Sequence, residues 1–130
     1  MIYGTGTDIC EIDRIKRACE RETFLKRTFS DEERRQALGS FSKLAGDFAV
    51  KEAVAKAMGT GIVFSPTEIE CLREKNGRPY VRVTGEAERI INSASESLGK
   101  SYSKKIHVSI SNTDKMAIAL AVLEFIRDDA

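Results

Sequence analysis

The segment FAVKEAVAKAMG, residues 48–59, places the strongest constraint on how this chain can fold. It has the composition of an α-helix that is apolar on nearly every side, with only Lys51, Glu52 and Lys56 charged. Helices of that kind are normally covered by other elements over most of their surface. We therefore expect the rest of the chain to be built around this helix.

Patterns typical of strands and helices lie on both sides of the central helix. We expect a strand at 2–7, a helix at about 12–22, a helix capped by Ser30 that ends near Gly39, the central helix at 42–58 closed by Gly59, strands at 67–73 and 79–84, a helix at 86–98, and final strands in KIHVSIS and MAIALAVLEF. Asn76-Gly77 is a strong hairpin signal between the middle strands. The pattern predicts one α+β domain over residues 1–130, a mostly antiparallel sheet packed against a long buried helix.

Composition excludes several classes of protein. The 130 residues are 42% hydrophobic and 32% charged, as in globular proteins and unlike disordered or membrane-spanning ones. The net charge of +1 gives no whole-molecule field for nucleic acid or a membrane. The N-terminus lacks the pattern of a secretory signal. Three widely spaced cysteines, Cys10, Cys19 and Cys71, indicate buried thiols in a reducing cytoplasm.

Two charges of the central helix share one face, because Glu52 and Lys56 are four residues apart. The plainer explanation is an ion pair, which contributes roughly 0.2–0.5 kcal/mol on an exposed helix. Burying such a pair would cost desolvation energy that its attraction need not repay. Retaining it on an apolar helix therefore suggests a polar cleft, with Phe48 and Ala55 beside the two charges, and a cleft suggests a ligand.

Asp8 provides a second acidic group. It shares one face of the first strand with Gly4 and Gly6, and glycine in a strand often marks close approach by a ligand or by another backbone. We expect the glycines to leave space beside the carboxylate, although a lone Asp at this position could simply cap the next helix. Asp8, Glu52 and Lys56 together would provide two carboxylates and a lysine, the groups that proteins commonly supply to a magnesium–phosphate site.

The last hairpin has one polar face, formed by His107, Ser109 and Ser111. The following strand alternates large residues with small ones, Ala117, Ala119 and Ala121. We expect the polar face to lie opposite these alanines, with room for the phosphate or sugar of a ligand. A solvent-facing side of an edge sheet, with a structural histidine, explains the same pattern.

Four motifs in order along the chain resemble the holo-[acyl-carrier-protein] synthases, the small bacterial 4′-phosphopantetheinyl transferases. They are GTGTDICEIDRI at 4–15, FAVKEAVAKAMGTGI at 48–62, NGRPYV at 76–81 and HVSIS at 107–111. The resemblance implies the fold of that family and transfer of the phosphopantetheine arm of coenzyme A to a serine of apo-acyl carrier protein. It also implies release of adenosine 3′,5′-bisphosphate, a role in fatty acid biosynthesis, Mg²⁺, and a homotrimer with active sites at subunit interfaces.

The resemblance also assigns roles to residues. Asp8 and Glu52 match the two metal-binding acids, and Lys56 matches the lysine that faces the coenzyme A diphosphate; these three are the catalytic candidates. The coenzyme A set implied by the resemblance comprises Lys56, Gly59, Gly61, His107, Ser109 and Ser111. Our hypothesis is that Glu52 both binds the metal and accepts the serine proton.

A basic stripe follows the first motif. Arg14, Arg17 and Arg21 are spaced at i, i+3 and i+7, which on one helix gives a single basic face. Such a face is usually just solvated, but the resemblance implies docking of an acidic carrier protein there.

The chain departs from the family pattern at two positions. Asp47 stands where the family commonly has a basic residue, and Asn112 stands where it often has a histidine. Both neighbourhoods are associated with the adenosine-phosphate end of coenzyme A in the family. The sequence offers Lys43, Arg34 and Arg35 as replacement charges.

Two other classes of protein fit part of the pattern. A trimeric binding module would hold a nucleotide or a carrier without chemistry, and a magnesium-dependent nucleotide hydrolase would need the same acids. The complete set of Asp8, Glu52 and Lys56 argues against the inert module, and the arginine stripe favours a protein substrate over hydrolysis.

Overall fold

The computed structural model describes residues 1–99 and 101–128, and its elements follow one another in an α+β order. They are β1 (Ile2–Glu11), α1 (Ile12–Ala18), α2 (Glu22–Thr28), α3 (Asp31–Ala37), α4 (Phe41–Met58), a 3₁₀ turn (Pro66–Glu68), β2 (Ile69–Arg73), β3 (Pro79–Val83), α5 (Gly85–Glu96), β4 (Tyr102–Asn112) and β5 (Met116–Arg127). Within the described residues, no helix combines the length and apolar character needed to cross a membrane.

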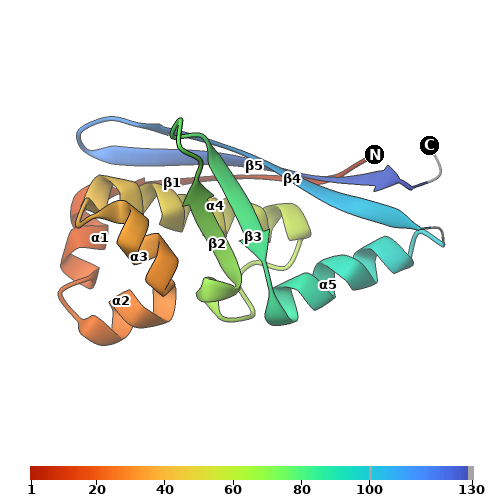
Figure 1. Ribbon diagram of the computed structural model, residues 1–130, viewed down its shortest axis with the longest axis horizontal. Helices are drawn as coiled ribbons and strands as arrows, with labels where there is room; N and C mark the ends of the chain where they lie inside the picture. Colours follow the sequence, from red (N-terminus) through yellow and green to blue (C-terminus); the bar gives the residue numbers. More distant parts are fainter. Residues whose placement is uncertain (100, 129–130) are drawn as a thin grey trace.

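The strands form two antiparallel sheets on different sides of α4. One has the order β1-β5-β4, and the other is the β2–β3 hairpin. Figure 1 shows the larger sheet as a layer above α4, with α1 to α3 gathered at one end of the molecule and α5 at the other. The predicted α+β fold with antiparallel pairing and a long central helix is confirmed.

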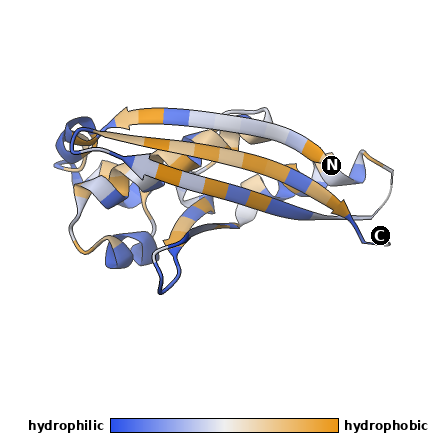
Figure 2. Ribbon diagram, turned by 90° about the horizontal axis from the view of Figure 1, so that it is seen from above, coloured by the Kyte–Doolittle hydropathy of each residue, from blue (hydrophilic) through white to orange (hydrophobic). Residues whose placement is uncertain are grey.

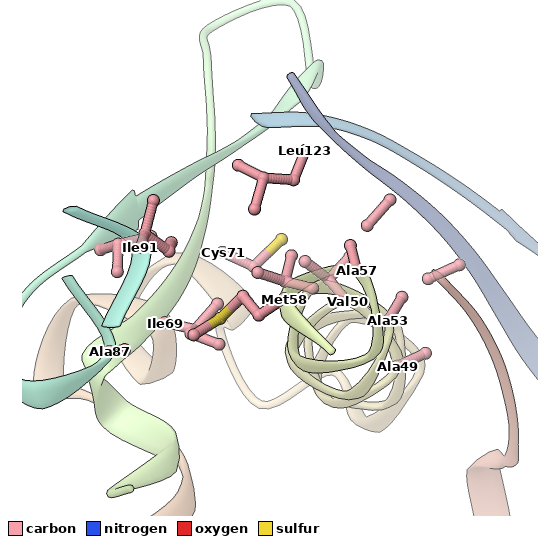
Figure 3. Close-up of a cluster of buried hydrophobic side chains, with 14 of the residues drawn as sticks. Ala49, Val50, Ala53, Ala57, Met58, Ile69, Cys71, Ala87, Ile91 and Leu123 are labelled. Atoms are coloured by element: carbon pink, nitrogen blue, oxygen red, sulfur yellow. The ribbon is translucent and has the colours of Figure 1, made fainter. Parts of the chain in front are cut away.

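Helix α4 is covered along its length, as its composition predicts. All residues from Ala49 to Ala55 are buried except Glu52. Figure 3 shows side chains of α4 packed between Leu123 of the sheet and Ile69 of the hairpin, with Ile91 of α5 closing the cluster. Burial of these apolar side chains supplies the main driving force for assembly.

Two glycines let β1 lie directly on α4. A Cβ atom on Gly6 would lie 1.9 Å from the carbonyl oxygen of Ala53, and one on Gly4 would lie 2.0 Å from that of Ala57. The glycines therefore mark the approach of another backbone. The expected space beside Asp8 is absent, because α4 fills it, and this contact is what brings the β1 carboxylate to the helix.

One charged pair is completely buried, and no pattern in the sequence predicts it. Lys51 Nζ donates hydrogen bonds to Glu33 Oε1 at 2.7 Å and to the carbonyl oxygens of Ile69 and Pro66 at 2.6 and 3.1 Å. Glu33 Oε2 accepts a hydrogen bond from the backbone N–H of Cys71 at 3.0 Å. Both side chains have no exposed surface. The pair joins α4, α3, the 3₁₀ turn and β2.

The segment predicted as one helix at 12–22 is two helices. Helix α1 ends at Ala18, and α2 begins at Glu22. The apolar spacing explains the break, because no apolar residue at 22 or 23 continues the stripe that contains Ile15. The predicted caps are correct: Ser30 begins α3 with a capping box, and Gly59 closes α4 in the left-handed conformation.

We expect Lys51→Met to be strongly destabilising, because it leaves the Glu33 carboxylate buried without a partner. Loss of one member of a buried pair typically costs about 3–5 kcal/mol in the free energy of unfolding. Urea unfolding would measure it. The control is Lys26→Met, which removes an exposed pair with Glu22 and should leave the unfolding midpoint nearly unchanged. Equal midpoints for the two variants would contradict this account.

Candidate active site

A pocket of about 500 Å³ opens beside α4, between β1, α1 and α2. Asp8 and Glu52 line it together with Arg14. Its remaining wall is largely apolar and includes Ile15, Ala18, Phe24, Phe48 and Met116. Acids that are 44 positions apart in the sequence therefore share one pocket, since β1 lies against α4. A few charged groups in an apolar pocket are typical of a ligand-binding site.

The side chain of Lys56 is held in place by contacts with β1. Its Nζ donates a hydrogen bond to the carbonyl oxygen of Thr7 at 2.8 Å and lies 3.4 Å from Asp8 Oδ1. Among residues 1–99 and 101–128, the carboxylate within ion-pair distance of Lys56 is that of Asp8 and not that of Glu52. A simple pair between Glu52 and Lys56 is therefore the wrong explanation for their spacing. The side chain of Lys56 is 53% exposed and remains available to an anionic ligand.

The environment of Glu52 raises the pKa of its carboxyl group. Partial burial contributes most, and the negative charge of Asp8 adds to it, while the positive charge of Lys56 acts in the opposite direction. Asp8 and Glu52 are thus close enough to repel each other. A cation between them would relieve this repulsion.

The pocket fits a hard divalent cation that takes only part of its ligands from protein. In the part of the chain that the structure describes, no cluster of three or more His, Cys, Asp or Glu side chains is placed to hold a metal ion. Asp8 and Glu52 could supply two carboxylates. Mg²⁺ is commonly bound in this way, with water and substrate phosphates completing its coordination.

The polar face of β4 does not reach this pocket within the same chain. His107, Ser109 and Ser111 pair with Val122, Leu120 and Ile118, so they lie on the outer face of the sheet with these large residues. The expected position opposite the small alanines is wrong, because Ala117, Ala119 and Ala121 are buried on the inner face against α4. His107 instead pairs with Glu124, at 2.9 Å between Nε2 and Oε1.

The predicted basic stripe is interrupted. Arg14 and Arg17 lie on α1, but Arg21 lies beyond the end of that helix and immediately before α2. Arg14 lines the pocket, and the three arginines are exposed. Arg14 and Arg17 therefore share one helix, whereas Arg21 does not continue their face.

The glycines expected in the coenzyme A site form the turn after α4. Gly59 and Gly61 both have positive φ angles, 85° and 67°, which favour glycine. Lys56 lies in the last turn of the same helix, so the turn and the lysine share one end of α4.

Arg73 is the charged residue that sequence reasoning missed near the two family departures. Asp47 is buried, and its Oδ1 atom lies 2.6 Å from Arg73 Nη1. Burial raises the pKa of Asp47 to about 6, against the opposing effect of Arg73. Asn112 Nδ2 donates a hydrogen bond to Ser42 Oγ at 2.6 Å. No motif in the sequence indicates that β2 would place an arginine against the central helix.

Comparison with known proteins gives a consistent result. Residues 4–121 match the model of the 4′-phosphopantetheinyl transferase superfamily. A holo-[acyl-carrier-protein] synthase of Lachnoclostridium phytofermentans is 44% identical over 130 residues, covering 98% of this chain and 100% of the relative. The synthase of Clostridium beijerinckii is 43% identical over 97% of this chain and 100% of its own length.

Solved structures show the same fold. The Chronobacterium ammoniagenes ACPS–CoA complex superposes with a TM-score of 0.79 at 29% identity, covering 95% of this chain and 98% of that one. The Bacillus anthracis synthase in complex with CoA (3′,5′-ADP) gives a TM-score of 0.74 at 33% identity, covering 95% and 97%.

We expect Asp8→Asn to lower the pKa of Glu52, because it removes the negative charge that contributes to the raised value. Lys56→Met should raise the same pKa further, since it removes the opposing positive charge. An NMR titration of the Glu52 carboxyl carbon without divalent metal would measure both. A Glu52 pKa that stayed unchanged in both variants would show that the three groups do not interact.

Proposed function

Because the chain belongs to the 4′-phosphopantetheinyl transferase superfamily, we propose that the pocket bearing Asp8 and Glu52 is the active site of a holo-[acyl-carrier-protein] synthase. The enzyme transfers the phosphopantetheine arm of coenzyme A to a serine of apo-acyl carrier protein. The observation that carries this assignment is that Asp8 and Glu52, from two elements far apart in sequence, line one pocket, with Lys56 Nζ 3.4 Å from Asp8 Oδ1. The proposed setting is fatty acid biosynthesis in the cytoplasm.

The three residues have distinct roles in this proposal. The serine oxygen of the carrier attacks the phosphorus that bears the pantetheine arm, and the bond from that phosphorus to the bridging oxygen breaks. Glu52 accepts the serine proton, directly or through a water molecule. Lys56 stabilises the departing 5′-phosphate of adenosine 3′,5′-bisphosphate and can donate a proton to it.

Asp8 and Glu52 would hold Mg²⁺ in this site. The two carboxylates fit the ion because they share a pocket and repel each other without it. When bound, the ion would neutralise negative charge on the diphosphate oxygens. The exposed ammonium of Lys56, 3.4 Å from Asp8 Oδ1, would add a second positive charge beside these carboxylates.

The carrier protein would dock at the arginine-bearing end of the pocket. Arg14 lines the pocket itself, while Arg17 is exposed in the last turn of the same helix and Arg21 is exposed just before α2. Acyl carrier proteins are acidic, so this surface would favour encounter with the partner and fix its orientation.

A homotrimer is the proposed assembly, and the outer face of the larger sheet supports it. Figure 2 looks onto this face. Ile9, Ile118 and Leu120 are 58%, 44% and 44% exposed there, which is unusual for neighbouring large apolar residues on a sheet. His107, Ser109 and Ser111 lie on the same face. Contact with another copy would cover the apolar residues and bring these polar side chains to that copy's active site.

We expect transfer activity to depend on both acids and on magnesium. Intact-protein mass spectrometry of an apo-acyl carrier protein, incubated with this protein and coenzyme A, should show addition of one phosphopantetheine arm with Mg²⁺ and none with EDTA. Glu52→Gln should lower turnover by at least about 10²-fold, as is typical for loss of general-base catalysis. Asp8→Asn should also lower turnover, because it removes a carboxylate that would hold the metal ion. Glu96→Gln, on the exposed surface of α5, is the control.

Failure of transfer to several carriers by a folded protein would contradict the proposed function. Release of nucleotide without any gain in carrier mass would instead indicate a hydrolase. A Glu52→Gln variant with full turnover would remove the base from the mechanism and leave the transfer assignment intact.

Charge reversal at the docking surface should weaken carrier binding. Arg14→Glu is expected to raise the KM for the carrier protein, with an effect that shrinks as salt screens the interaction. Steady-state kinetics at two ionic strengths would measure this, with Arg89→Glu on α5 as the matched control. An effect on kcat alone, or one that is insensitive to salt, would argue against electrostatic docking.

The outer sheet face should control the oligomeric state. Sedimentation equilibrium is expected to give three times the 14.4 kDa mass of one chain. Leu120→Lys places a charge on the proposed interface and should produce monomers, whereas Arg89→Lys should not. A monomeric wild-type protein with full activity would overturn the proposed assembly.

A further inference from the structure

The turn between α3 and α4 holds a leucine that the chain itself does not bury. Leu38 is 84% exposed, more than any other large apolar residue within 1–99 and 101–128. It does not line the active-site pocket. A single exposed leucine is common on protein surfaces and by itself indicates nothing. The backbone conformation of Leu38 is what sets it apart.

The backbone of this turn is unfavourable for leucine. The N–H of Ser40 donates a hydrogen bond to the carbonyl oxygen of Ala37 at 2.9 Å. The two residues between them have positive φ angles, 50° at Leu38 and 78° at Gly39. Such a turn favours Asn-Gly, because Asn and Gly enter the left-handed region most easily. A large apolar side chain kept exposed in this conformation, where a polar one would fit at lower cost, is typical of a functional position.

The turn lies next to α1, the helix at which we expect the carrier to dock. Ala37 packs in one buried cluster with Ile15 of α1. Lys16, the next residue of α1, places its Nζ atom 6.0 Å from the centre of the Phe41 ring at the start of α4. Figure 1 shows α1 and α3 at the same end of the molecule. Because Ile15 also lines the active-site pocket, α1 connects that pocket to the turn.

The surroundings of the turn are positively charged. The sequence from 34 to 46 contains Arg34, Arg35 and Lys43 but no acidic residue. The two arginines pair with acids at the start of α3. In the part of the chain that the structure describes, Lys16 and Lys43 are exposed and form no ion pair. An exposed apolar side chain within such a surface fits an acidic protein partner that offers an apolar recess.

We propose that Leu38 is an apolar anchor for the carrier protein and helps to determine how tightly this enzyme binds it. The inference rests on the proposed function and adds a contact outside the active-site pocket. The carrier is an acidic protein, so the charges around the turn favour its approach, and it can extend from the pocket across α1 to the turn. Burial of Leu38 on binding supplies apolar contact energy, which ion pairs on a solvated surface provide only weakly.

The test compares the wild-type protein with Leu38→Asn and Leu38→Met in transfer to an apo-acyl carrier protein. Leu38→Asn should raise the KM for the carrier by at least about tenfold, the ratio that corresponds to 1.4 kcal/mol. The KM for coenzyme A and kcat should stay within about threefold of the wild type. Leu38→Met keeps an apolar side chain and should restore the wild-type KM for the carrier. Arg89→Gln, an exposed arginine on α5 paired with Glu86, should behave as the wild type.

Turn chemistry separates a binding role of Leu38 from a structural one. Leu38→Asn should leave the midpoint of urea unfolding unchanged or raise it, because Asn adopts the left-handed conformation at lower cost than Leu. A lower midpoint would overturn the inference, since it would show that Leu38 packs against its own chain. An increase in the KM for coenzyme A as large as that for the carrier would also overturn it, because the leucine would then contact the donor.

Calorimetric binding of the apo-carrier in the absence of coenzyme A provides a readout independent of transfer. Leu38→Asn should bind the carrier at least about tenfold more weakly than the wild type. Equal affinities would overturn the inference and leave the proposed function standing. A smaller mass for Leu38→Asn than for the wild type in sedimentation equilibrium would also overturn it, because it would assign Leu38 to a contact between copies of the chain. Absence of transfer together with weaker carrier binding by Leu38→Asn would contradict only the proposed function.

Discussion

The buried ion pair between Lys51 and Glu33 determines how the two halves of this fold meet. Lys51 lies on the side of α4 that faces away from the three-stranded sheet, and its hydrogen bonds reach α3, the 3₁₀ turn and β2. Two fully buried charges are stable only when their hydrogen-bonding capacity is satisfied. The pair therefore requires these elements to sit at one position on the helix. The opposite side of α4 is then free to receive β1.

Successive residues of α4 point in different directions around the helix axis, so neighbouring charged side chains lie in different environments. Lys51 is buried, whereas Glu52, the next residue, turns toward the pocket, and Lys56 follows Glu52 by about one turn. The close approach of β1 through Gly6 then places Asp8 beside both. The position of the candidate metal site is thus fixed by two contacts of a single helix, an ion pair on one side and a backbone contact on the other.

The sequence could predict those parts of the structure that depend on local chemistry. The period of α4, the cap at Ser30, the hairpin at Asn76-Gly77 and the antiparallel α+β class follow from spacing and residue type, and the structure confirms them. The joint presence of Asp8, Glu52 and Lys56 also indicated a shared site. The family resemblance supplied the identity of the ligand, which spacing alone does not contain.

Features that depend on tertiary contacts could not be predicted in this way. Nothing in the spacing of Glu33 and Lys51 shows that they pair, and Arg73 belongs to a short strand without a motif. The face of β4 that holds Ser109 was misplaced because strand alternation gives two faces without showing which one α4 covers. The break after Ala18 could be predicted only by noticing that the apolar stripe does not continue beyond Cys19.

The most direct measurement is a crystal structure of this protein grown with coenzyme A and Mn²⁺, with anomalous scattering used to locate the metal. The account predicts a manganese peak between the carboxylates of Asp8 and Glu52, in contact with the diphosphate of the donor, with Lys56 on the same phosphates. A metal bound elsewhere, or a diphosphate away from these three residues, would contradict the central claim that this pocket is the active site.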